Sequence, residues 1–333
     1  MAEYKDVLIL GEVTDGKLAA ITCELLGCGR RLANELGEKL SAVLIGSGVS
    51  DTAKQAIAFG ADKVYVVDDP LLKDYRTDPY VAVTKKVIEQ VMPQILLLGQ
   101  TSIGRDLAPR LAFRLGTGLS MDCVELSIDP QTKLLLQTRA VYGGNARATF
   151  TCEADRPQIA TVRPKAMSPL ERDDSRQGEI VVLEAAIDPS TIRIEVLEKV
   201  KEEVEGVKLE DAEAVVCGGR GIGGAEGFKQ LEDLAKVLKG AVGATRPPCD
   251  NGWVPATIQV GLTGKIVTPD IYIAVALSGS SQHMTGCSDA KNIIAINKDT
   301  EANIFREARF GLAADWKQAL PAFTEKVKEL LAG

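Results

Sequence analysis

The chain has 333 residues, of which 45% are apolar, and its formal net charge is −7 at pH 7. A chain of this length and composition buries a sizeable core, in two domains rather than one, which excludes a disordered or fibrous protein. Its charges are mixed along the sequence without long basic blocks, so binding to nucleic acid or to an anionic membrane has no electrostatic support.

Seven cysteines and a single histidine argue against a zinc or iron–sulfur site, because the cysteines form no CxxC pair. We interpret them as buried or free thiols of a reducing compartment. The first residues, "MAEYKDVLILGE", contain charges and do not form a signal peptide. The longest uncharged stretch, 271–288, is too polar over its second half to span a membrane. We therefore expect a prokaryotic cytoplasmic location.

Four short apolar runs open the chain, and segments with helical spacing separate them: "DVLIL", "SAVLIG", "KVYVVD" and "QILLLG". This alternation predicts parallel strands joined by crossover helices. After about Leu119 the pattern changes to strand-like runs with short turns, "LLLQTRAVYGG", "RATFTCE" and "PQIATVRP", which predict an antiparallel extension. We expect one N-terminal α/β domain over residues 1–205.

The stretch 198–210, "EKVKEEVEGVKLE", has few apolar residues and predicts a solvated linker or a short exposed helix. Beyond it the alternation returns in the runs "AEAVVCGG", "GAVGA", "IYIAVALSG" and "NIIAINKD". Two helices carry apolar residues on one face, the first at Phe228, Leu231, Leu234, Ala235 and Leu238 and the closing one at Leu320, Phe323, Val327 and Leu330. We predict a second, doubly wound parallel sheet over residues 206–333.

Ligands bind beyond the carboxyl ends of such strands, so the loops there are the first candidates for a site. Gly219, Gly221 and Gly224 form a GxGxxG between a strand and a helix, which by itself suggests a nicotinamide dinucleotide. An NAD enzyme would hold the ribose with Asp or Glu at the end of the next strand, where Thr245 and Arg246 stand. An NADP enzyme that uses Arg246 and a purely structural glycine turn both stay open.

A second loop of small residues, "LSGSSQHMTG", lies at 277–286 and contains the only histidine. Small residues let a phosphate approach free backbone N–H groups at the start of a helix, so a pyrophosphate fits this loop. The alternative is that Ser278 or Ser280 only caps the helix. The nearby loop "QVGLTGK", 259–265, favours the pyrophosphate interpretation.

Several of these loops together resemble the α subunit of electron transfer flavoproteins. The matching stretches are "VVCGGRG", "VGATRPPCDNGWVP", "QVGLTGKIVTPDIYIAVALSGSSQHMTG" and "IIAINKDTEANIFREARFGLAADW", in the family's order and near its spacing. The resemblance is dense from Val215 onward and more diffuse over the first domain, where "GQTSIGRDLAPRLA" and "RAVYGGNA" still match. It implies that residues 206–333 form an FAD-binding domain and that residues 1–205 contact a β subunit.

The resemblance also implies a set of residues that bind FAD and no catalytic or metal-binding residue. Arg246 would lie against the isoalloxazine ring with Arg220 near the flavin, His283 would face the carbonyl edge of the flavin as a neutral donor or a cation, and Asn297 and Asp315 would meet the adenosine end. The full set is Arg220, Thr245, Arg246, Gln259, Val260, Gly261, Thr263, Gly264, Ser278, Gly279, Ser281, Gln282, His283, Asn297 and Asp315.

This sequence differs from the family pattern at a few positions near the loops. Thr245 stands where the family has Ser, and Ala276 replaces a Gly. Neither change removes a hydrogen-bond donor, so we expect FAD binding to be kept.

By the same resemblance, the chain is an electron carrier rather than an enzyme with its own substrate. It pairs with a β subunit that holds a second nucleotide, AMP or FAD. Electrons enter from acyl-CoA dehydrogenase-type flavoenzymes, as in fatty acid β-oxidation, and leave to a membrane quinone oxidoreductase or another acceptor. The alternatives are the α subunit of a flavin-bifurcating NADH-linked complex, an NADP-dependent oxidoreductase with His283 as its acid–base group, and a nucleotide-binding regulatory module.

Overall fold

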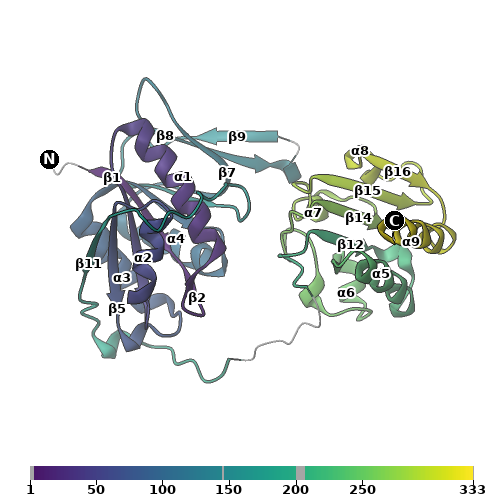
Figure 1. Ribbon diagram of the computed structural model, residues 1–333, viewed down its shortest axis with the longest axis horizontal. Helices are drawn as coiled ribbons and strands as arrows, with labels where there is room; N and C mark the ends of the chain where they lie inside the picture. Colours follow the sequence, from purple (N-terminus) through teal and green to yellow (C-terminus); the bar gives the residue numbers. More distant parts are fainter. Residues whose placement is uncertain (1–3, 145, 200–206, 333) are drawn as a thin grey trace. The chain divides into compact units, whose positions relative to one another are not determined.

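The fold is taken from a computed structural model, which describes residues 4–144, 146–199 and 207–332. The chain divides into two compact units (Figure 1): a first unit of Met1–Ala140 with Arg147–Lys199, and a second of Val141–Ala146 with Val200–Gly333. The predicted boundary between residues 205 and 206 and most of the predicted linker lie outside the described residues.

The first unit contains a mixed sheet of nine strands within the described residues, in the order β11-β5-β4-β1-β6-β10-β7-β8-β9. Their bounds are β1 Lys5–Gly11, β4 Leu40–Gly46, β5 Lys63–Asp68, β6 Pro93–Gly99, β7 Leu119–Ile128, β8 Leu135–Val141, β9 Ala146–Phe150, β10 Gln158–Val162 and β11 Glu179–Val182. A separate two-stranded ribbon pairs β2 Val13–Thr14 with β3 Lys17–Leu18. The four predicted parallel strands are β1, β4, β5 and β6, all parallel to their neighbours.

The predicted antiparallel extension is confirmed where β8 runs antiparallel to β7. The prediction was wrong for "PQIATVRP", which forms β10 and lies between β6 and β7, parallel to both. All five residues of β10 are buried. A strand covered on both faces in the middle of a parallel sheet has the same continuous apolar sequence wherever it inserts, so the local pattern does not reveal its neighbours.

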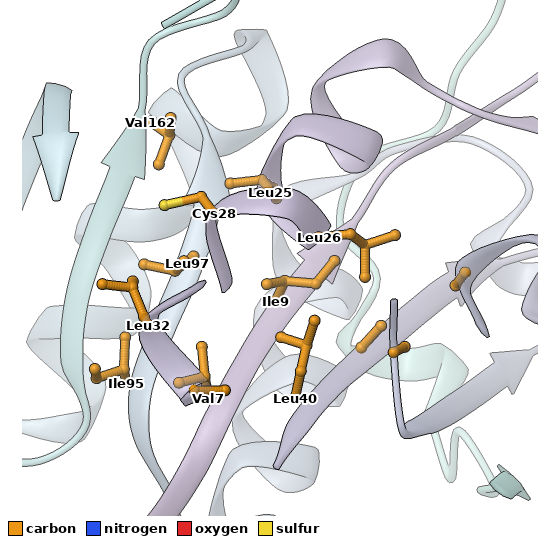
Figure 2. Packing of buried hydrophobic residues seen from close by; sticks show 14 of the residues in the cluster. Val7, Ile9, Leu25, Leu26, Cys28, Leu32, Leu40, Ile95, Leu97 and Val162 are labelled. Carbon is orange, nitrogen blue, oxygen red and sulfur yellow. The ribbon is translucent and has the colours of Figure 1, made fainter. Parts of the chain in front are cut away.

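Helices cover both faces of this sheet, and alternate residues of β1 point to opposite sides. Val7 and Ile9 belong to the core cluster beneath α1 (Ala20–Leu36), which Figure 2 shows with Leu25 and Leu32 of that helix packed around them. The neighbouring Leu8 belongs to the opposite cluster, beneath α3 (Thr77–Val91) and α4 (Ser102–Leu115). Each such buried aliphatic side chain stabilises the fold by about 1.5–3 kcal/mol.

The second unit contains a parallel sheet in the order β13-β12-β14-β15-β16, so the predicted doubly wound parallel sheet is confirmed. The strands are β12 Ala214–Gly218, β13 Ala241–Ala244, β14 Ile271–Val275, β15 Asn292–Asn297 and β16 Phe310–Ala313. The last of these was not predicted. Its residues are apolar, but the strand is only four residues long and exposed at the edge of the sheet, so its short run does not distinguish a strand from a loop.

One face of this sheet is covered by α5 (Ala225–Val237) and α9 (Trp316–Ala332), as Figure 1 shows. The predicted apolar face of α5 is confirmed, with Phe228 and Leu231 buried. On α9, Leu320 is buried but Leu330 is 72% exposed, because the helix continues past the edge of the core. The remaining helices are short: α2 Ala53–Ala58, α6 Arg246–Asp250, α7 Ser281–Met284 and α8 Ile304–Glu307, with 3₁₀ turns η1 Ser50–Thr52, η2 Pro70–Leu72, η3 Tyr142–Gly144, η4 Pro189–Thr191, η5 Arg220–Ile222 and η6 Ala256–Ile258.

Candidate functional site

The loops that carry the predicted FAD-binding residues meet at one edge of the second sheet. All five strands are parallel, so their carboxyl ends share that edge, where open α/β sheets bind ligands. Strand order reverses between β12 and β14, because β13 lies on one side of β12 and β14 on the other. We call this place the switch point of the second unit. The predicted residues follow the strands in turn: Arg220 after β12, Thr245 and Arg246 after β13, Ser278, Gly279, Ser281, Gln282 and His283 after β14, Asn297 at the end of β15, and Asp315 after β16.

The turn after β12 contacts the backbone of the loop after β14. The N–H of Gly219 donates to the carbonyl of Val275 at 3.0 Å, and the N–H of Gly221 donates to that of Ala276 at 3.1 Å. A Cβ at Gly219 would lie 2.4 Å from the Ala276 oxygen, and one at Gly221 would lie 2.8 Å from it. At Gly224, by contrast, a Cβ would meet nothing within 4 Å. Two glycines therefore allow the loops to touch, and the third faces open space.

The loop after β14 exposes backbone donors. Gly279 has φ of 74°, and its Cβ would lie 2.5 Å from the Ile304 nitrogen, so only glycine fits. Within the described residues, the N–H groups of Ser278, Gly279 and Ser280 have no acceptor in the protein. Ser280 occupies the N-cap position of α7 without a side-chain cap bond, which leaves the capping alternative without support. Because α7 has four residues, free N–H groups rather than a helix dipole favour an anion here.

The loop 259–264 is held against both β13 and α7. The N–H of Val260 donates to Ala244 at 2.8 Å, and the N–H of Leu262 donates to the carbonyl of Gln282 at 2.7 Å. Gly261 has φ of 140°, and its Cβ would lie 2.9 Å from that same carbonyl. The Gln259 amide donates to Oγ1 of Thr263 at 2.9 Å. This loop therefore lines the same sheet edge as the loop after β14. It contains the predicted residues Gln259, Val260, Gly261, Thr263 and Gly264.

The two predicted arginines are exposed at this edge. Arg246 is the first residue of α6, and its Nε donates to a carboxylate oxygen of Asp250 at 3.1 Å. Its side chain is 66% exposed, so it is accessible to a ligand. Arg220 is also exposed, in η5 next to the glycine turn. Guanidinium groups carry a positive charge at any physiological pH.

His283 differs from the predicted ring donor. It is 5% exposed, and both ring nitrogens have protein partners: Nε2 lies 2.9 Å from the hydroxyl of Tyr272, and Nδ1 lies 3.0 Å from the carbonyl oxygen of Val260. Burial lowers the pKa of His283 to about 4, so the ring is neutral at pH 7. The cationic alternative is therefore wrong for this structure, and neither ring nitrogen faces outward as a donor.

A cavity of about 170 Å³ opens where the sheet edge meets the start of α9. Asn297 and Asp315, the two residues predicted for the adenosine end, line it together with Gly221, Gly223 and Trp316. The Asn297 amide donates to the Leu277 carbonyl at 2.8 Å, and the Trp316 indole donates to the Gly221 carbonyl at 3.1 Å. Asn297 thus supports the loop after β14 as well as the cavity.

Two of these side chains were missed by the sequence reasoning. Tyr272 lies within the apolar run of β14 and resembles an ordinary core residue. Trp316 opens α9 and resembles the start of an amphipathic helix. Their only local signal is a polar atom on an aromatic ring in a buried position, where such groups normally require a partner.

Within the described part of the chain, no cluster of three or more His, Cys, Asp or Glu side chains is arranged to hold a metal ion. None of the helices described there is both long and apolar enough to cross a membrane.

Comparison with known proteins identifies the family. The model of the electron transfer flavoprotein domain matches residues 7–188, and that of the electron transfer flavoprotein FAD-binding domain matches residues 208–288. The electron transfer flavoprotein subunit alpha of Thermoanaerobacterium thermosaccharolyticum is 46% identical, over 99% of this chain and 100% of that protein. That of Megasphaera elsdenii is 44% identical, over 99% and 98%. The acryloyl-CoA reductase electron transfer subunit beta of Anaerotignum propionicum is 37% identical, over 98% and 96%. The chain therefore belongs to the electron transfer flavoprotein family, as an alpha subunit.

Proposed function

We propose that the second unit binds one FAD and that the chain, paired with a β subunit, carries electrons between other redox proteins. The donors are acyl-CoA dehydrogenase-type flavoenzymes, and the acceptor is a quinone oxidoreductase or another electron acceptor. The β subunit holds a second nucleotide, AMP or FAD. When bound, the FAD of the second unit supplies the redox chemistry by taking up and releasing one or two electrons.

The observation that carries the proposal is the edge formed at the switch point of the second unit. Glycines let two loops meet there, and the N–H groups of Ser278, Gly279 and Ser280 are free to donate to a pyrophosphate. The cavity lined by Asn297 and Asp315 lies at the same edge, where the adenosine end would bind. The residues present therefore fit an extended dinucleotide.

The charge near this edge comes from Arg220 and Arg246. A reduced flavin carries negative charge on its N1–C2=O edge, so a cation held there makes reduction more favourable. A full charge at about 4 Å with an effective dielectric near 20 contributes roughly 4 kcal/mol, on the order of 170 mV for one electron. Arg246 is 66% exposed, and solvent screening reduces its contribution to about 1 kcal/mol.

The other interpretations receive less support. Membership of the electron transfer flavoprotein family does not favour an NADP-dependent oxidoreductase. Both ring nitrogens of His283 have protein partners, which leaves neither free for proton transfer to a substrate. The flavin-bifurcating alternative is not favoured by the family match either.

The proposal is tested on the chain co-expressed with its β subunit. We expect a flavin absorbance spectrum after gentle purification and its bleaching on anaerobic addition of a reduced acyl-CoA dehydrogenase. Extraction and counting of nucleotides should give one FAD for this chain, plus one AMP or FAD for the partner. A complex that folds but carries no flavin would refute FAD binding, and a flavin that the dehydrogenase leaves oxidised would refute the donor class.

A further inference from the structure

Tyr272, His283 and Val260 form a buried hydrogen-bonded series in the second unit. The Tyr272 hydroxyl lies 2.9 Å from Nε2 of His283, and Nδ1 of that ring lies 3.0 Å from the Val260 carbonyl oxygen. Tyr272 is 0% exposed and His283 is 5% exposed. His283 is the only histidine of the chain, so every histidine ring signal from this chain belongs to it.

The three groups determine where the protons lie. A carbonyl oxygen accepts hydrogen bonds and cannot donate them, so the proton between Val260 and Nδ1 belongs to the ring. A neutral imidazole carries one N–H, which leaves Nε2 as an acceptor. The Tyr272 hydroxyl then donates to Nε2. The arrangement therefore specifies a neutral imidazole with its proton on Nδ1.

The surroundings of the pair are neutral as well. The titratable groups that face Tyr272 are the thiols of Cys217 on β12 and Cys287 after α7. Burial raises the pKa of Cys287 to about 12 and that of Cys217 further, and it raises the pKa of the Tyr272 hydroxyl well above its ordinary value. The Cys287 thiol also donates to the His283 carbonyl at 3.7 Å. Among the described residues, no charged side chain contributes to the pKa of the imidazole.

The series joins three elements of the predicted flavin site. Tyr272 belongs to β14, Val260 to the loop 259–264, and His283 to α7. A second bond, from the N–H of Leu262 to the Gln282 carbonyl at 2.7 Å, links the same loop to the same helix. The imidazole thus links the loop 259–264 to α7 through its side chain, in addition to the backbone bond between them.

We propose that Tyr272 is a positioning residue for the flavin site: by donating to Nε2, it keeps the His283 ring turned into the core as a neutral Nδ1–H imidazole that ties the loop 259–264 to α7. This inference rests on the proposed function only in identifying these loops as the lining of an FAD site. Positive charge toward the flavin then comes from Arg220 and Arg246, and His283 acts through loop geometry.

The first test observes the ring directly and needs no variant. The full chain is produced with ¹⁵N-labelled histidine and assembled with its unlabelled partner subunit, and ring ¹⁵N–¹H correlations are recorded from pH 5 to pH 8, with and without FAD. We expect a single Nδ1–H tautomer throughout. A tautomer protonated on Nε2, or a ring that titrates near the ordinary histidine pKa, would overturn the inference. Because the readout is the imidazole, it stays decisive even for a chain that fails to bind FAD.

The second test removes one hydroxyl while keeping the aromatic ring. Tyr272→Phe should shift the Nε2 signal, raise the pKa of the imidazole by about one unit, and shift the midpoint potential of bound flavin. The matched control is Tyr80→Phe in the first unit, whose hydroxyl donates to the Leu72 carbonyl at 3.1 Å. This control should leave the ring signals and the potential unchanged. If Tyr272→Phe folds and the ring signals and pKa match those of the native chain, the proposal is wrong.

Discussion

In each unit, the first strand of the sheet has parallel neighbours on both sides, so the strand order reverses beside it and creates a switch point. The residues at the two switch points have opposite chemistry. In the first unit, β1 lies between β4 and β6, and Glu12 follows it directly. Oγ1 of Thr101, after β6, donates to Oε1 of Glu12 at 2.6 Å. In the second unit, the corresponding place after β12 holds Gly219, and Gly279 follows β14.

This difference decides what each edge can hold. The Glu12 side chain lies against the end of β6, since a Cβ at Gly99 would be 3.3 Å from Oε1. Burial raises the pKa of Glu12, and a carboxyl group there occupies the place of a phosphate and, when ionised, repels it. In the second unit, no acidic side chain directly follows β12, and the N–H groups of Ser278, Gly279 and Ser280 after the neighbouring β14 have no acceptor among the described residues. The shared topology sets where a site lies, and the loop residues determine whether an anion binds.

The largest expected effect comes from filling the glycine contact of the second unit. In Gly219→Ala, the new Cβ would lie 2.4 Å from the Ala276 oxygen and 2.5 Å from Cα of Leu277. We expect a loss of about 3 kcal/mol in the free energy of unfolding of the second unit, and loss of FAD. Both tryptophans, Trp253 and Trp316, lie in the second unit, so fluorescence during denaturation reports this unit alone.

The matched control in the same turn is Gly224→Ala, whose Cβ meets nothing within 4 Å. Its backbone has φ of 163°, an extended conformation open to any residue. Equal destabilisation by the two substitutions would contradict the role assigned to the contact between the loops.

Opposite pH dependences should separate the two units. Burial raises the pKa of Glu24 in α1 from 4.5 to about 7, although its carboxylate accepts from the Lys165 N–H at 2.7 Å. Its stabilising contribution to the first unit is complete below about pH 4.5 and lost as the pH rises through 7. The lowered pKa of His283, about 4 against an ordinary 6.5, has the reverse effect on the second unit. There the contribution is complete above pH 6.5 and lost as the pH falls through 4.

Each of these two terms is roughly 3 kcal/mol over its full range. Tryptophan fluorescence should therefore show the second unit gaining stability from pH 5 to pH 7, while hydrogen exchange in β1 and α1 shows the first unit losing it. In Glu24→Gln, the first unit should no longer lose stability as the pH rises, and the second unit should still gain it. Parallel pH profiles for the two units would contradict both assignments.

A smaller effect is expected from the exposed cation of the second unit. Arg246→Ala should lower the midpoint potential of bound FAD by on the order of 40 mV, roughly a fivefold change in a one-electron equilibrium. Arg246→Lys keeps the charge and should recover most of this potential, although it loses the planar guanidinium. Potentiometric titration of the three proteins measures the effect. An unchanged midpoint potential in the alanine variant would show that Arg246 does not influence the flavin.

The smallest effect concerns Ala276, which has a left-handed φ of 51°. Alanine in this region costs about 1 kcal/mol, and glycine relieves that cost but gains flexibility in the unfolded chain. We expect Ala276→Gly to stabilise the second unit by about 0.5 kcal/mol. The control Ala274→Gly, inside β14, should destabilise it, because a strand interior requires no left-handed backbone.

Much of the fold could be predicted because buried strands carry apolar runs. The runs at β1, β4, β5, β6, β12, β14 and β15 each mark a strand, and the chain order of strands and helices indicates parallel sheets. The insertion of β10 between β6 and β7 could not be predicted, because pairing partners distant in sequence leave no local signature. The exposed β16 is apolar but only four residues long, too short a run to predict a strand by itself.

The sequence identifies the loops of the proposed site but not the hydrogen bonds inside it. Glycine and serine residues after parallel strands indicate where an anion binds, and the strands bring these residues to one edge. The inward orientation of His283 depends on Tyr272 and Val260, eleven and 23 residues away. Burial of that ring, which decides its charge, is a property of the packed unit rather than of the loop sequence.

The most direct test of the central claim is the FAD content of the purified complex in three forms: the native chain, Gly219→Ala in the second unit, and Glu12→Gln in the first. The account predicts one FAD for each native chain, the same amount in Glu12→Gln, and a loss in Gly219→Ala that exceeds any loss of folded protein. Equal flavin losses from the two variants, or a native complex without FAD, would contradict the assignment of the cofactor to the switch point of the second unit.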